Sequence, residues 1–247
     1  MYPFRNPIEV ITKVVDKTRR HAVARQWLSK GLPVYACPLC DFRGSFLSTL
    51  GAKDKRLAAI CPNCGAFERH RLQKLVLDRL NESAVQFAGK SCLQFSPDPI
   101  SPFLMSLCEH LMLVSDSPHE NELKIDMRKI PMGDETVDIV FASHVLEHIQ
   151  DDMTALNEVR RVLKPGGIAI LPVPVSCTEP TVEYASPREF GHVRAPGLDY
   201  FDRYTKVFGQ TDLFQSSQFS KSYQTHIIAI DGSRSEETVP VSTKTKL

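Results

Sequence analysis

The sequence lacks a long apolar segment, and its longest apolar run, residues 168–175, is interrupted by prolines. A helix that crosses a bilayer needs roughly 18 to 20 such residues. The sequence also lacks an N-terminal apolar core followed by a small-residue cleavage site, and it shows no lipidation motif at either end. We therefore expect a cytoplasmic protein without a transmembrane segment.

Internal repeats are absent as well. Hydrophobic residues make up 42% of the 247 residues and charged residues 24%, which excludes a wholly disordered or fibrous chain. A chain of this length forms one large or two small domains.

Charge is distributed unevenly along the chain. Residues 1–90 contain 16 Lys and Arg against 7 Asp and Glu, whereas residues 91–247 contain 14 against 22. This asymmetry indicates two modules with different roles. Residues 7–30, within a first segment 1–33, have the pattern of a basic amphipathic helix. That helix either packs on the rest of the protein or contacts a membrane surface or another anionic partner.

Four of the seven cysteines form two matched pairs. Cys37 and Cys40 form one C-x2-C pair, and Cys61 and Cys64 form another after 20 intervening residues. Two such turns direct four thiolates at one ion, so the spacing predicts a closed structural zinc site in residues 34–82, a ribbon followed by a linking helix. A redox pair and four unrelated core thiols are the alternatives.

From residue 83 onwards, short apolar runs alternate with helical patterns. This alternation predicts a doubly wound, mostly parallel α/β sheet in residues 83–231. The expected strands are 91–95, 111–115, 137–142 and 168–173, and the expected helices are 67–80, 102–109, 151–163 and 199–208. We expect Gly166 and Gly167 to cap a helix, residues 212–215 and 223–230 to form a closing antiparallel pair, and residues 232–247 to be a disordered tail.

Residues 126–167 carry the most informative motifs. They include HVLEH at 144–148 and RVLKPGG at 161–167. This stretch closely resembles the class I S-adenosylmethionine-dependent methyltransferases, in which a fourth strand leads from an Asp into HVLEH and RVLKPGG precedes the fifth strand. The resemblance implies a Rossmann-like fold with S-adenosylmethionine bound beyond the carboxyl ends of the strands.

The same resemblance implies a set of cofactor-binding residues. Asp116, at the end of the second strand, is the candidate for holding the ribose hydroxyls, because a carboxylate accepts from two hydroxyls at once. A turn or helix-cap role is its alternative. The other implied residues are Asp126 and Met127 near the adenine, and Ser143 and His144 near the sulfonium and the methionine limb.

The turn after the first strand departs from the general family pattern. The family has a glycine-rich turn there, whereas residues 94–99 contain no glycine. A narrower resemblance, to bacterial methyltransferases with a four-cysteine ribbon, an ERHR segment (68–71 here) and an "APE"-like turn, covers about residues 35–210. It implies that Ser96 and Asp98 meet the cofactor in a different turn.

The residues after the fifth strand form the acceptor side by resemblance. FGHVR at 190–194 is similar to the "FGxxDHVR" of the narrower group but shorter. This similarity predicts His192 as a proton acceptor and Arg194 as a residue that holds an anionic or hydroxyl-rich substrate. Alternatively, both tie down the loop. Glu147 is a weaker candidate base, and His148 is expected to be a structural hydrogen-bonding residue.

Three functions remain compatible with these patterns. The first is methyl transfer to a small or saccharide-type acceptor, with an O-methyl product. The second is a nucleic-acid methyltransferase that docks phosphates through its ribbon and basic N-terminus. The third is a non-catalytic module that keeps the fold without the cofactor.

Overall fold

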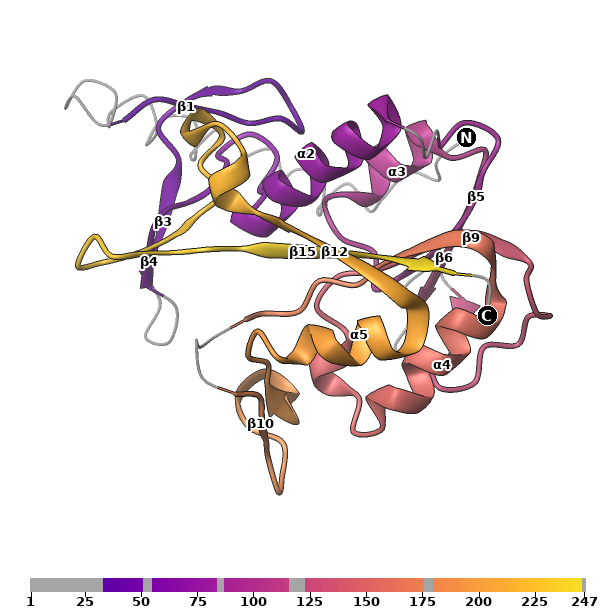
Figure 1. Cartoon of the computed structure of the whole chain (residues 1–247). Coiled ribbons are helices and arrows are strands. Elements are labelled where there is room, and N and C mark those ends of the chain that lie inside the picture. Colours follow the sequence, from indigo (N-terminus) through magenta and orange to yellow (C-terminus); the bar gives the residue numbers. More distant parts are fainter. Residues whose placement is uncertain (1–32, 51–54, 84–86, 116–122, 176–179, 246–247) are drawn as a thin grey trace, which may run out of the picture. The chain divides into compact units, whose positions relative to one another are not determined.

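The structure, a computed structural model, describes residues 33–50, 55–83, 87–115, 123–175 and 180–245 (Figure 1). The expected N-terminal helix at 7–30 and Asp116 lie outside the described residues. Two compact units form, one from residues 1–75 and 216–236 and the other from 76–215 and 237–247. None of the described helices combines the length and the apolar character needed to cross a bilayer.

The first unit is built from short antiparallel strands. A hairpin joins β1 and β2, and a separate sheet has the order β14-β13-β4-β3. The bounds are β1 (Tyr35–Ala36), β2 (Arg43–Gly44), β3 (Leu47–Leu50), β4 (Lys55–Ile60), β13 (Ile227–Ala229) and β14 (Arg234–Ser235), with the 3₁₀ turns Ser216–Gln218 and Lys221–Tyr223. The helix α2 (Glu68–Glu82), expected at 67–80, contains the boundary between the units.

The second unit is a seven-stranded sheet with the order β12-β15-β9-β8-β5-β6-β7. Strands β9, β8, β5, β6 and β7 pair in parallel, and β15 is antiparallel to both of its neighbours. The bounds are β5 (Ser91–Phe95), β6 (His110–Ser115), β7 (Leu123–Lys124), β8 (Val137–Ala142), β9 (Leu163–Ile170), β12 (Gly209–Gln215) and β15 (Thr238–Lys244). This order confirms the predicted doubly wound sheet of the Rossmann-like methyltransferase fold.

Helices cover both faces of this sheet. Figure 1 shows α4 (Asp152–Val162) and α5 (Tyr200–Phe208) on one face and α3 (Ser101–Leu107) on the other. The main core lies under α4 and α5, where Leu156 and Tyr204 pack with inward residues of the strands such as Phe95 and Val140. A small hairpin of β10 (Val182–Glu183) and β11 (Arg194–Ala195) follows β9 along the chain, and two more 3₁₀ turns span Leu146–His148 and Glu189–Gly191.

The C-terminal segment differs from the predicted disordered tail. Residues 238–244 form β15, which lies between β9 and β12. Val239 and Val241 are buried in this strand. Both are β-branched, and such residues favour strands. Pro240 lies just before the segment paired with β9, so its missing N–H interrupts no ladder there.

Two further predictions of local structure were wrong. Strand β12 pairs with β15 rather than with residues 223–230, and β13 belongs to the other unit, so the predicted 83–231 boundary does not hold. Gly166 and Gly167 do not cap the helix, which ends at Val162, but form an irregularity within β9. A Cβ at Gly167 would lie 2.8 Å from the carbonyl oxygen of Asp138, so that position needs glycine for space.

Candidate active site and cysteine cluster

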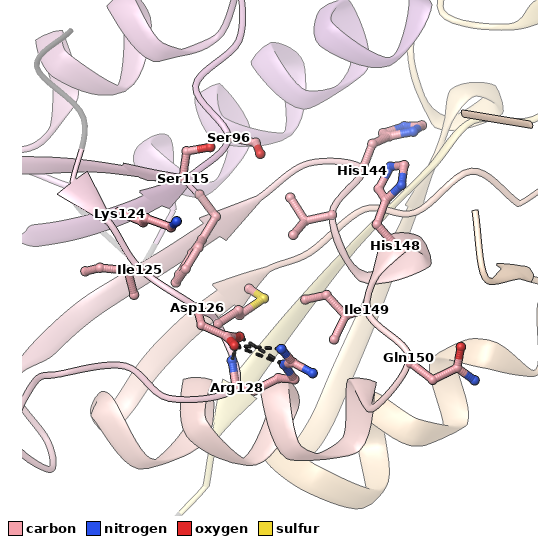
Figure 2. A pocket seen from close by; sticks show the side chains of 13 residues that line it. Ser96, Ser115, Lys124, Ile125, Asp126, Arg128, His144, His148, Ile149 and Gln150 are labelled. Carbon is pink, nitrogen blue, oxygen red and sulfur yellow. Dashed lines mark hydrogen bonds and ion pairs between the residues drawn. The ribbon is translucent and has the colours of Figure 1, made fainter. Parts of the chain in front are cut away.

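A cavity of about 670 Å³ opens at the carboxyl ends of the parallel strands (Figure 2). It is lined by Phe95 and Ser96 at the end of β5, Ser115 at the end of β6, residues 124–128 from the end of β7 onwards, and, after β8, residues 144–145 and 148–150. In open α/β sheets this edge is where ligands bind. Four of the predicted cofactor residues therefore lie together in its lining, namely Ser96, Asp126, Met127 and His144.

The turn after β5 is built without glycine. Ser96 adopts a φ of 51°, and its amide donates to the carbonyl oxygen of Val114 over 2.9 Å. Asp98 accepts from the amide of Ile100 over 2.9 Å, and its own amide donates to Ser101 Oγ. Asp98 thus shapes the turn ahead of α3 and does not line the cavity, whereas Ser96 does.

Asp126 forms a charged pair on one side of the cavity. It accepts from the backbone amide of Arg128 over 2.8 Å and from the guanidinium of Arg128 over 2.7 Å, as Figure 2 shows. These hydrogen bonds hold the pKa of Asp126 below its usual value. The carboxylate is about half exposed, so it stays accessible to a ligand in the cavity.

The segment after β8 gathers ionisable groups on the other side of the cavity (Figure 2). His144 has a φ of 56°, and its Nδ1 lies 3.4 Å from Glu147 Oε1, while Nε2 of His148 lies 3.9 Å from the same oxygen. Glu147 is fully buried. The predicted Ser143 is also buried and does not line the cavity.

His192 lies beside this group. Its ring centre is 4.8 Å from that of His148, with the two rings at 75°. His192 also lines a second cavity of about 350 Å³, together with Tyr184, Arg188 and Phe190. Burial lowers the pKa of His192 and so favours the neutral imidazole. The pair of histidines thus connects the linings of two cavities.

Arg194 has a different environment from the one that we predicted. Its side chain is 1% exposed and donates to the carbonyl oxygens of Leu146, Ile149 and Gln150 over 2.6 to 3.0 Å. It also donates to the carboxylate of Glu183. This arrangement makes Arg194 a positioning residue for the segment after β8 rather than a contact for substrate. The three carbonyl partners lie more than 40 residues earlier, so no local pattern predicts these contacts.

The four paired cysteines lie together in the first unit. Sγ of Cys37 is 3.6 Å from Sγ of Cys64, Sγ of Cys40 is 3.6 Å from Sγ of Cys61, and all four sulfurs lie within 4.8 Å of one another. A sulfur tetrahedron about 2.3 Å from a zinc ion has edges of about 3.8 Å, so the cluster fits that ion. Each C-x2-C turn is followed by a residue with a positive φ, Asp41 with 55° and Gly65 with 76°.

The comparisons with known proteins concern the second unit. Residues 107–171 match the model of a family described as a methyltransferase domain. The segment runs from the end of α3 to β9, so it includes Asp126, His144 and Glu147. Over these residues the chain is similar to a methyltransferase domain.

Two curated proteins match over short segments. An uncharacterized methyltransferase of Schizosaccharomyces pombe is 42% identical over 66 residues, which is 26% of this chain and 22% of that protein. A demethylmenaquinone methyltransferase of Streptomyces avermitilis is 46% identical over 46 residues, 19% of this chain and 20% of that protein. The chain thus spans about a fifth of the length of these relatives.

Solved structures with similarity include a methyltransferase described as putative from Bacillus halodurans, with 15% identity and a TM-score of 0.45 over 69% of this chain and 99% of that one. An S-adenosylmethionine-dependent methyltransferase from Mesorhizobium loti has 10% identity and a TM-score of 0.49 over 70% of this chain and 97% of that one.

Proposed function

We propose that this protein is an S-adenosylmethionine-dependent methyltransferase that binds its donor in the 670 Å³ cavity. The observation that carries the proposal is the position of that cavity, at the carboxyl ends of β5, β6 and β8 in a sheet of this order. When bound, S-adenosylmethionine supplies a methyl group on a sulfonium. The protein contributes Asp126 and Ser96 as polar groups in the lining, together with the apolar side chains of Met127 and Ile149.

The acceptor is proposed to bind on the side of His192 and to be methylated on oxygen. The second cavity supports this, because it combines an aromatic ring, that of Tyr184, with the guanidinium of Arg188 4.2 Å above it. Aromatic rings and arginine suit a saccharide-type or anionic small molecule. A hydroxyl acceptor must lose a proton as the methyl group arrives, and His192 is the side chain that we predicted to accept it.

The four-cysteine cluster is proposed to bind a structural zinc ion. Four thiolates complete a closed tetrahedron and leave no open position for a substrate. Cys37, Cys40, Cys61 and Cys64 would hold the ion and so stabilise the first unit.

A titration with S-adenosylhomocysteine, the spent donor, tests the proposed function. We expect calorimetry to detect one binding site per chain, and we expect Asp126→Asn to weaken binding about tenfold without lowering the melting temperature of the free protein. Asp231→Asn, a change at an exposed Asp of the first unit, is the matched control and leaves binding unchanged. Absence of any binding to the zinc-loaded wild-type protein would refute the proposal.

A further inference from the structure

The carboxylate of Glu147 has an unusual environment for a buried acid. Its side chain is 0% exposed, and neither carboxylate oxygen has a hydrogen-bond partner within the described part of the chain. A buried carboxylate without hydrogen bonds or a cation costs several kcal/mol, so such a group is normally paired or binds a metal. Glu147 therefore needs a positive partner.

Arginine and lysine do not supply that partner among the described residues. The basic side chains within 4 Å of its carboxylate there are His144, with Nδ1 at 3.4 Å, and His148, with Nε2 at 3.9 Å. The nearby guanidinium of Arg194 is directed instead at three backbone carbonyls and Glu183. The remaining sources of positive charge are protonated histidines or a bound cation.

The geometry of the histidines suits a cation. One ligand atom each from Glu147, His148 and His192 lies within 4.8 Å of the other two. Two imidazoles that bind one zinc ion at about 2.1 Å have ring centres roughly 5.3 Å apart at the tetrahedral angle and roughly 4.6 Å apart at a right angle. The ring centres of His148 and His192 are 4.8 Å apart, and the rings are nearly perpendicular, so neither ring stacks over the other.

We propose that Glu147, His148 and His192 form a second metal site, which binds a divalent cation with the preferences of Zn²⁺. Two imidazoles and one carboxylate are a common donor set for such ions. Three protein ligands leave a coordination position open, unlike the closed four-cysteine cluster. The backbone supports the arrangement, because the amide of Val193 donates to the carbonyl oxygen of Glu147 over 2.9 Å and so links the two segments that carry the ligands.

The role of this site in catalysis rests on the proposed function, although the site itself does not. His148 lines the proposed donor cavity and His192 lines the second cavity. A cation between them is placed to bind an acceptor oxygen and to stabilise the deprotonated hydroxyl by its charge. In that arrangement His192 acts as a ligand and not as the proton acceptor. The cation lowers the pKa of the bound hydroxyl so that its proton passes to solvent water, and the oxygen takes the methyl group from the sulfonium, which leaves as a thioether.

Zinc content per chain tests the site without any activity measurement. The full-length protein is loaded with zinc, freed of unbound ion and measured by elemental mass spectrometry. We expect two zinc ions in the wild type, and one in each of the variants Glu147→Gln and His192→Ala. His110→Ala is the matched control, because the side chain of His110 is 77% exposed and belongs to neither proposed metal site. We expect this variant to retain two zinc ions.

A cobalt-loaded sample identifies which site is lost. Cobalt bound to four thiolates gives intense charge-transfer absorption, whereas cobalt bound to nitrogen and oxygen does not. We expect Glu147→Gln to keep the thiolate spectrum, which also shows that the variant is folded, while it loses one metal ion. Equal metal content in the wild type, Glu147→Gln and His192→Ala would overturn the proposal and would indicate protonated histidines as the partners of Glu147.

The outcomes separate this inference from the proposed function. Binding of S-adenosylhomocysteine without a second zinc ion would overturn the metal site and leave the methyltransferase proposal intact. A second zinc ion that depends on Glu147, in a protein that does not bind S-adenosylhomocysteine, would support the metal site and refute the methyltransferase proposal.

Discussion

The guanidinium of Arg194 donates to the carbonyl oxygen of Leu146 over 2.6 Å, and so joins the end of the β10–β11 hairpin to the segment after β8. Both groups are buried. The segment that Arg194 holds carries Glu147 and His148, and His192 lies two residues before Arg194. One buried arginine thus fixes the relative positions of the groups that line the two cavities.

We expect Arg194→Ala to lower the free energy of unfolding by about 3 kcal/mol or more. The variant removes the donor to the buried carbonyl oxygen of Leu146 and to the partly buried ones of Ile149 and Gln150, and it removes a partner of Glu183. Urea denaturation measures the change. Arg188→Ala, at an exposed position nearby, serves as the control with an effect within about 0.5 kcal/mol. Similar losses in both variants would show that the buried network is not what stabilises this segment.

The turn after β5 supplies a second prediction. Ser96 has a φ of 51°, a conformation that glycine adopts freely and β-branched residues resist. We expect Ser96→Val to destabilise the protein by about 1 to 3 kcal/mol, and Ser96→Gly to leave stability within about 1 kcal/mol of the wild type. Ser96→Ala, which removes the hydroxyl but keeps the Cβ, controls for the lost polar group. Equal melting temperatures for the Val and Gly variants would contradict the argument.

Most elements of the sheet could be predicted because their signal is local. Each parallel strand is a short apolar run, such as residues 91–95, and the helix at 152–162 shows apolar residues at helical spacing. The paired spacing of the cysteines likewise predicts that the four sulfurs meet. In these cases neighbouring residues determine the local structure and tertiary contacts agree with it.

The missed features depend on partners that are distant in the sequence. Residues 238–244 are polar enough to suggest a tail, and only pairing with β9 and β12 makes them a strand. The burial of Arg194 depends on carbonyl groups more than 40 residues earlier. Similarly, the sequence shows Glu147 as an acid beside histidines but not that its carboxylate is fully buried. Periodicity contains no information on such pairings.

The cysteine cluster gives a third prediction. We expect Cys61→Ser to lower the zinc content by one ion per chain and to lower the melting temperature, because metal binding at a structural site contributes directly to folding. A chelator should lower the melting temperature of the wild type and have a smaller effect on the variant. Cys108→Ser is the control, because Cys108 is a buried cysteine outside the cluster. Unchanged zinc content in Cys61→Ser would refute the assignment.

The last prediction concerns Asp138, near the start of β8. Burial opposes ionisation of its carboxyl group, but hydrogen bonds from Lys164 Nζ at 2.7 Å and from the amide and hydroxyl of Ser91 outweigh it and lower the pKa of Asp138 to about 2. A second cation, Nζ of Lys90, lies 3.6 Å from the carboxylate of Asp138. Because the pKa is lowered on folding, the ionised group stabilises the native state above the unfolded value near 3.8, and this contribution disappears as the pH falls through about 2.

We therefore expect Asp138→Asn to be less stable than the wild type at pH 7, by about 1 to 2 kcal/mol after allowance for solvent screening at the half-exposed Lys164. The difference should shrink as the pH is lowered from 4 to 2, and denaturation curves at several pH values measure it. Asp212→Asn, at an exposed position of β12, is the control and should show no such trend. A difference between Asp138→Asn and the wild type that stays constant down to pH 2 would mean that the charge of Asp138 is not what holds β5 and β9 to the start of β8.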